Sequence, residues 1–106
     1  MYGEITAEEL RNRIAAGEDI NLIDVREPDE WQAGHIKEAR SIPLSEFVER
    51  VHELHREGRD DQEIVLICRS GGRSGKACDY LAPQGYTVVN VLGGMLAWQG
   101  DVEYGD

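Results

Sequence analysis

Residues 63–81 read EIVLICRSGGRSGKACDYL, and this stretch decides the fold. Its apolar run from Ile64 to Ile67 has no polar face, which predicts a strand buried on both sides. Cys68 follows directly at the carboxyl end of that strand. After a loop rich in Gly and Ser, the spacing of apolar residues from Ser74 to Leu81 is helical. The stretch therefore predicts a strand, a short loop and a helix in succession.

The rest of the chain alternates in the same way between apolar runs and segments with helical spacing. Thr6 and Glu9 form a capping box that predicts the start of a helix, and Gly17 ends it. Further strands are predicted at 20–25, 42–44 and 88–92, and further helices at 29–33, 47–57 and from Gly94 to about Trp98. No linker, repeat or low-complexity tract interrupts the pattern, so we expect one domain over residues 1–106.

Apolar strands separated by helical segments are typical of an α/β fold, in which helices cover both faces of a parallel sheet. Right-handed crossovers place the carboxyl ends of all such strands along one edge, where ligands of this fold class bind. Asp24, Cys68 and the pair Leu92-Gly93 are predicted to lie at that edge.

Composition limits the range of functions. The chain has 11 Lys and Arg against 21 Asp and Glu, which gives a formal net charge of −10. Such a field repels nucleic acids and anionic membranes, so neither is an expected partner. No apolar run approaches the roughly 18 residues of a membrane span, and the amino terminus does not resemble a secretory signal. We expect a soluble, cytoplasmic protein.

The loop after the central strand is suited to holding an anion at Cys68. Gly71 and Gly72 allow backbone N–H groups to converge on one point, and the following helix directs its positive end there. Arg69 and Arg73 add whole charges. Lowering a thiol pKa by about two units takes roughly 2.7 kcal/mol, which a few charge-assisted hydrogen bonds and a helix terminus supply. The alternative is a small apolar Cys that merely ends a core strand.

Three segments together resemble a single-domain rhodanese-type sulfurtransferase, and they cover essentially the whole chain. The first comprises DVREPDEW at 24–31, GHI at 34–36 and ARSIP at 39–43; the second is CRSGGRS at 68–74; the third comprises Gly85-Tyr86, Val89 and LGGMLAW at 92–98. The resemblance implies a three-layer α/β/α fold with a five-stranded parallel central sheet. Glu38 departs from the family pattern, which usually has Gly there.

The family's mechanism implies that the Cys68 thiolate takes the outer sulfur of a donor such as thiosulfate. A thiol or cyanide then accepts that sulfur from the Cys68 persulfide, and no metal or organic cofactor takes part. A protein acceptor is also compatible with this scheme. The resemblance assigns the active-site loop and its substrate-binding groups to Arg69, Ser70, Gly71, Gly72, Arg73 and Ser74.

Two residues at and just after the end of the strand predicted at 20–25 are expected to support the loop. Asp24 is expected to pair with Arg73 rather than act as a general base, because a carboxylate would oppose a thiolate. Arg26 is expected to pair with an acidic neighbour.

Other reactive side chains are expected to be structural. His35 is expected to form a hydrogen bond near the sheet edge instead of a Cys–His dyad. His52 and His55 lack the further ligands that a zinc site needs. Cys78 is expected to pack in the core.

Two rival functions remain open. A phosphatase or arsenate reductase of the cell-cycle dual-specificity type shares this architecture, but it needs five residues between its Cys and Arg. Only four separate Cys68 from Arg73, and the smaller ring suits a single sulfur atom. The other rival is a persulfide carrier that delivers sulfur to a protein partner, or a module used only for binding. Inactive relatives of the family commonly lack the cysteine, so the presence of Cys68 argues against the binding-only module.

Overall fold

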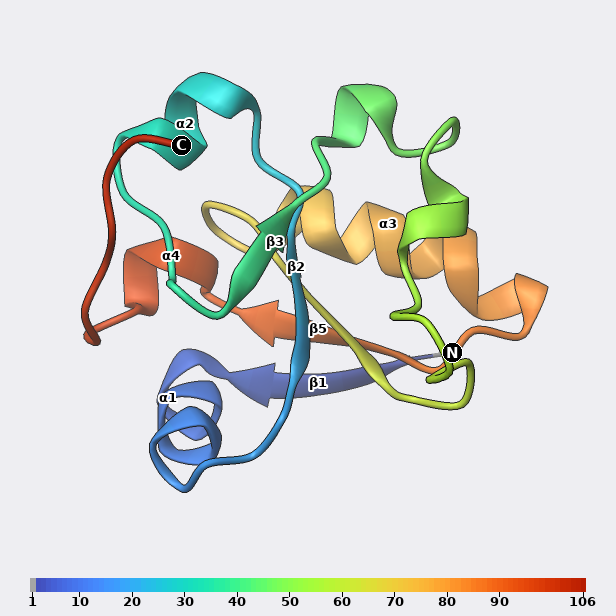
Figure 1. Cartoon of the computed structure of the whole chain (residues 1–106), viewed down its shortest axis with the longest axis horizontal. Helices are drawn as coiled ribbons and strands as arrows, with labels where there is room; N and C mark the ends of the chain where they lie inside the picture. The colour runs from blue at the N-terminus through green and yellow to red at the C-terminus, as the bar shows by residue number, and fades with distance from the viewer. Residues whose placement is uncertain (1) are drawn as a thin grey trace.

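A five-stranded parallel sheet forms the centre of the computed structural model, which describes residues 2–106 (Figure 1). The strands lie in the order β1-β5-β4-β2-β3, and every neighbouring pair is parallel. Their bounds are Gly3–Thr6 for β1, Asn21–Asp24 for β2, Ala39–Ser41 for β3, Ile64–Ile67 for β4 and Val88–Leu92 for β5.

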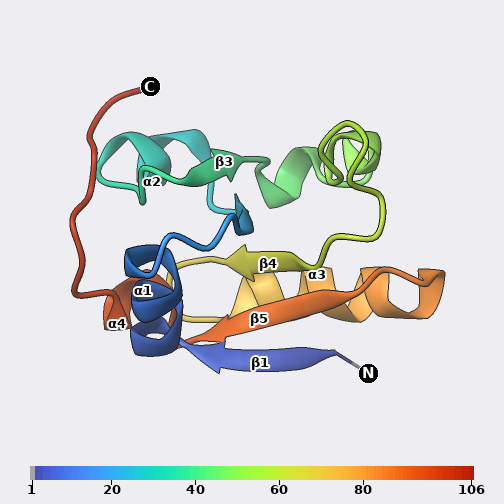
Figure 2. The same ribbon diagram turned by 60° about the horizontal axis from the view of Figure 1, so that its bottom comes forward.

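Helices cover both faces of this sheet. The α-helices are α1 (Ala7–Ala15), α2 (Pro28–Gln32), α3 (Gly72–Leu81) and α4 (Gly94–Ala97). Helix α3 packs on one side of β4 and β5, while α1 contacts β1, β5 and α4 on the other side (Figures 1 and 2). The predicted three-layer α/β/α architecture is confirmed.

The central strands owe their position to their sequence. All four residues of β4 and all four of β2 are buried, as the apolar run at 64–67 predicts. Because parallel strands in this fold have a helical layer on each face, the side chains of β4 alternate between two clusters. Ile64 and Leu66 face α3, and Val65 and Ile67 face α1.

Two strands differ from the sequence prediction. Strand β1 was not predicted, because its four residues lie at the edge of the sheet and are mostly exposed, so they carry no apolar run. The third strand lies at Ala39–Ser41 instead of 42–44. Ile42 still donates its N–H to Asp24 O, but Pro43 has no N–H with which to extend the ladder.

The predicted helix at 47–57 is also wrong, because the structure has short 3₁₀ turns at Leu44–Glu46 and Val51–Glu53. The Arg40 side chain donates hydrogen bonds to the backbone carbonyls of Glu53 and Leu54, at 2.9 and 2.8 Å. Those carbonyls therefore accept hydrogen bonds from Arg40, which lies outside the segment 47–57. Phe47 and Leu54 still reach the core, as the apolar spacing required.

Candidate active site

Cys68 occupies the first position after β4, at the carboxyl edge of the sheet. The chain then turns through Gly71, whose φ of 105° is left-handed, and enters α3. The turn is held from the opposite side by the start of α4. Met95 N–H donates to Cys68 O and Leu96 N–H donates to Arg69 O, both at 2.9 Å. The backbone of Cys68 is thus fixed by two elements that meet at this edge.

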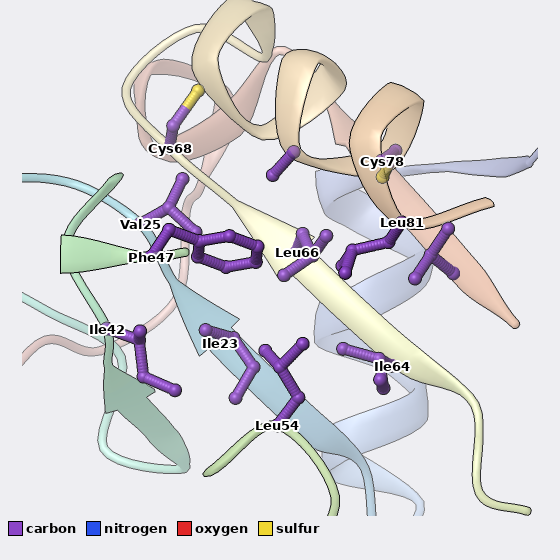
Figure 3. Packing of buried hydrophobic residues seen from close by; sticks show 12 residues of the cluster. Ile23, Val25, Ile42, Phe47, Leu54, Ile64, Leu66, Cys68, Cys78 and Leu81 are labelled. Atoms are coloured by element: carbon purple, nitrogen blue, oxygen red, sulfur yellow. The ribbon is translucent and has the colours of Figure 1, made fainter. Parts of the chain in front are cut away.

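The sulfur of Cys68 faces the turn and not the hydrocarbon core. Gly71 N–H lies 3.1 Å from the sulfur, and the Ser74 hydroxyl oxygen lies 3.3 Å from it. Figure 3 shows the sulfur pointing away from Phe47 and Leu66, toward the start of α3. Cys68 as a whole is only 1% exposed. The sulfur is therefore covered, but by hydrogen-bond donors.

This environment favours the thiolate. Burial by itself raises the pKa of Cys68. Hydrogen bonds from the Ser74 hydroxyl and from the backbone N–H groups of Ser74, Gly71 and Ser70 outweigh that effect, so the pKa of the thiol lies below its ordinary value. A lowered pKa increases the fraction of thiolate, which is the nucleophilic form of cysteine.

Asn90 is a member of the site that the sequence analysis did not single out. The Ser74 hydroxyl lies 2.5 Å from Asn90 Oδ1 and donates its single proton either there or to the Cys68 sulfur, while Asn90 Nδ2 donates to Gly71 O at 3.1 Å. A Cβ on Gly75 would lie 3.4 Å from Asn90 Nδ2, so the missing side chain leaves room for the amide. A polar residue inside the apolar run 88–92 was the available signal.

Asp24 does not pair with Arg73, and that prediction is corrected. Its partner is Arg26, whose Nη2 lies 2.8 Å from Asp24 Oδ2 in a buried ion pair. The Arg26 backbone N–H also donates to Asp24 Oδ1 at 3.0 Å, because only one residue separates the two. The expectation that Arg26 pairs with an acidic neighbour is confirmed.

Arg73 instead pairs with Glu30 on α2. Its Nη1 and Nη2 lie 2.6 and 2.8 Å from the two oxygens of that carboxylate. The hydrogen bond to Arg73 is the main cause that lowers the pKa of Glu30 to about 2. Glu30 was not predicted as a site residue, because it lies 43 positions away and only the fold brings it to the loop.

The remaining loop residues lie at the surface. Arg69, Ser70 and Gly72 are exposed. Within residues 2–106, the Arg69 side chain makes no hydrogen bond or ion pair. One loop arginine is thus neutralised and the other remains open to a ligand.

The family model for the rhodanese-like domain matches residues 6–101. The chain belongs to the rhodanese-like family. Among its relatives, the YtwF protein of Bacillus subtilis, named as a candidate sulfurtransferase, is 43% identical over 94% of this chain and 93% of its own length. A protein of Allochromatium vinosum named as a sulfurtransferase is 41% identical, over 92% of this chain and 89% of its own length.

Solved structures agree with this assignment. The crystal structure of a rhodanese-like domain protein from Staphylococcus aureus superposes with a TM-score of 0.86 at 31% identity. The match covers 98% of this chain and 99% of the other. The five-stranded parallel sheet flanked by helices is therefore the fold of a known rhodanese-like domain.

The histidines of this rhodanese-like chain take structural or surface positions. His35 Nδ1 lies 2.8 Å from Trp31 O, and the two rings stack with centroids 3.7 Å apart, in accord with its predicted structural role. The His52 side chain is 74% exposed. Within residues 2–106 there is no cluster of three or more His, Cys, Asp or Glu side chains suited to a metal ion.

The second cysteine, Cys78, lies in the core. Cys78 is fully buried in the cluster between α3 and the sheet, as predicted, and both cysteines are free thiols. None of the helices formed by residues 2–106 is both long and apolar enough to cross a membrane.

Proposed function

We propose that this chain is a sulfurtransferase that moves a sulfane sulfur from thiosulfate or a persulfide donor to a thiol or cyanide acceptor through a persulfide on Cys68. The observation that carries the proposal is the position of the Cys68 sulfur within hydrogen-bonding reach of Gly71 N–H and the Ser74 hydroxyl. Donors so placed stabilise negative sulfur, which both the resting thiolate and the persulfide intermediate require.

The first half-reaction loads Cys68. Its thiolate attacks the outer sulfur of thiosulfate and a new S–S bond forms. The S–S bond of the donor breaks, and its electron pair leaves with sulfite. The persulfide that remains ends in a negatively charged sulfur, and the turn around Cys68 carries the backbone N–H groups of Ser70 and Gly71, donors of the kind that stabilise such an anion.

The second half-reaction unloads the persulfide. A thiolate or cyanide attacks the outer sulfur, and the electron pair of the broken S–S bond returns to Cys68 as its thiolate. The low pKa of Cys68 makes it a good leaving group in this step. No step draws on a metal or an organic cofactor. The cycle needs Cys68 reduced, which is consistent with a cytoplasmic setting.

The surroundings of the sulfur support small reactants. The two residues that follow Cys68 in the loop, Arg69 and Ser70, are exposed, so the buried Cys68 is adjacent in the chain to the protein surface. Arg69 offers a positive charge to an anionic donor. A phosphoryl group is less well served, because Arg73 is already bound by Glu30 through both terminal nitrogens.

Intact-mass measurement after brief exposure to thiosulfate tests the proposal. We expect one added sulfur atom on the wild type and none on Cys68→Ser. Cys78→Ala is the matched control, because Cys78 is the only other thiol and lies in the core, and it should load like the wild type. A wild type that gains no sulfur, or that hydrolyses an aryl phosphate efficiently, contradicts the proposal.

A second assay separates an enzyme from a carrier. Multiple turnovers with thiosulfate and a small thiol support the enzyme. A persulfide that forms but passes only to a particular protein supports the carrier, which uses the same Cys68 chemistry.

A further inference from the structure

The two arginines of the active-site loop differ in electrical state. Arg73 places both terminal nitrogens on the carboxylate of Glu30, at 2.6 and 2.8 Å. Arg69 is exposed and has no side-chain partner within residues 2–106. A donor anion that reaches Cys68 therefore meets one uncompensated positive charge and not two.

Glu30 is held in this position by a rigid framework. Its Oε1 also accepts the backbone N–H of Glu27 at 3.1 Å. Its carbonyl accepts a bond from Arg26 Nη1 at 3.2 Å, and Arg26 is fixed in the buried pair with Asp24. The carboxylate is therefore held by Arg73 and by the Glu27 N–H, and the backbone of Glu30 is held separately by Arg26.

The charge of Arg73 acts on the reacting sulfur. Arg73 directly precedes Ser74 in α3, and the Ser74 hydroxyl oxygen lies 3.3 Å from the Cys68 sulfur, so Arg73 belongs to the turn that surrounds the sulfur. The hydrogen bond to Glu30 is the main cause that raises the pKa of Arg73, and the negative charge of a Cys68 thiolate raises it further. Charged groups on the elements around the turn are Arg69 in the loop, Glu30 on α2, Arg73 on α3 and the Asp24–Arg26 pair at the end of β2, while residues 92–98 contribute no charge.

We propose that Glu30 is a specificity-determining residue, which neutralises Arg73 and thereby tunes the site to sulfane donors of low charge, such as organic persulfides and thiosulfonates, over inorganic dianions. This rests on the sulfurtransferase function proposed above. A dianion gains more than a monoanion from each uncompensated cation, so neutralising one arginine penalises the dianion more. The net charge of −10 acts in the same direction.

The test compares two donors on matched variants. The donors are thiosulfate, a dianion, and methanethiosulfonate, a monoanion, and the readout is the ratio of their kcat/KM values. In Glu30→Gln we expect this ratio to rise about three- to fivefold in favour of thiosulfate, mainly through KM. Asp29→Asn is the charge-matched control, because exposed Asp29 lies on the same helix without a contact to Arg73.

A further variant separates charge from shape. Glu30→Asp keeps the negative charge, so its ratio of kcat/KM values should equal that of the wild type. If the effect of Glu30→Gln came only from a looser loop, Glu30→Asp would change the ratio by as much. A ratio that does not change in Glu30→Gln, or that changes equally in Asp29→Asn, overturns the role of Glu30. A wild type without turnover on either donor contradicts the proposed function itself.

Discussion

The Ser74 hydroxyl lies 2.5 Å from Asn90 Oδ1, and this contact ties the first turn of α3 to the middle of β5. The amide of Asn90 is oriented by its other end, which donates to Gly71 O. Gly71 and Ser74 are the residues whose polar groups contact the Cys68 sulfur. One buried amide thus anchors both.

Replacing Asn90 should slow sulfur loading. Asn90→Ala removes two buried hydrogen bonds, so we expect a loss of about 1–3 kcal/mol in the free energy of unfolding and a several-fold slower reaction of Cys68 with thiosulfate. Asn21→Ala is the control. Asn21 is also buried and bonds Leu54 O at 2.8 Å, but it lies at the opposite end of β2 from the site. It should lose comparable stability and load at the normal rate once folded; equal slowing of both variants would refute a specific role.

The two thiols should differ sharply in alkylation by iodoacetamide. Burial, with smaller contributions from Asp79 and Glu4, raises the pKa of Cys78 to about 12, whereas the pKa of Cys68 is lowered. Because the thiolate is the reactive form, only Cys68 should be modified near neutral pH. Peptide mapping after timed alkylation measures this directly. The pH at which the rate at Cys68 reaches half its maximum should lie below that of an unperturbed cysteine in a model peptide measured under the same conditions.

The Glu30–Arg73 pair should make stability depend on pH in the acid range. The pKa of Glu30 is lowered from 4.5 to about 2 by Arg73, so the pair stabilises the fold fully above pH 4.5. That stabilisation is lost progressively as the pH falls from about 4.5 to about 2. Since the pair is partly exposed, we expect about 1 kcal/mol. Urea unfolding of the wild type and Glu30→Gln at pH 6 and pH 3 measures it. The difference between the two proteins should shrink at the lower pH, and a constant difference would rule the pair out as its cause.

Gly94 should tolerate no side chain. Its φ is +52°, and a Cβ there would overlap Cys68 O and lie 2.7 Å from Arg69 O, both rigid backbone atoms. Gly94→Ala should therefore cost at least about 3 kcal/mol and disturb the Cys68 turn. Gly17→Ala is the control, because φ there is +83° with nothing within 4 Å of the new Cβ. It should cost only the backbone strain, about 1–2 kcal/mol. Thermal unfolding and thiosulfate loading of both variants provide the comparison.

Local patterns predicted the parts of the fold that local physics determines. The capping box of Thr6 and Glu9 starts α1, with both reciprocal hydrogen bonds present. The apolar run at 64–67 is the central strand, and the Cys that follows it lies in the predicted turn. These features depend on periodicity and capping within a few residues, which the sequence states directly.

The sequence alone did not predict which charged side chains form ion pairs with one another. Asp24 and Arg73 both lie near the loop, yet Arg26 is closer along the chain to Asp24, and α2 delivers Glu30 to Arg73. Such pairings depend on how a short helix is placed over the sheet edge. The helix prediction for 47–57 was wrong for a related reason. Side chains from β2 and β3, Asn21 and Arg40, donate hydrogen bonds to the backbone carbonyls of Leu54 and Glu53.

The carboxyl-terminal segment of the chain has a consequence for how the site assembles. Glu103 and His35 exchange backbone hydrogen bonds at 2.8 and 2.9 Å, and Gly105 N–H donates to Gln32 O, so the segment lies against the end of α2 (Figures 1 and 2). Helix α2 carries the carboxylate that restrains Arg73. During synthesis on the ribosome, Cys68 and its turn emerge before residues 103–105 do. A nascent chain therefore contains its nucleophile before residues 103–105 can form their hydrogen bonds to Gln32 and His35 beside α2.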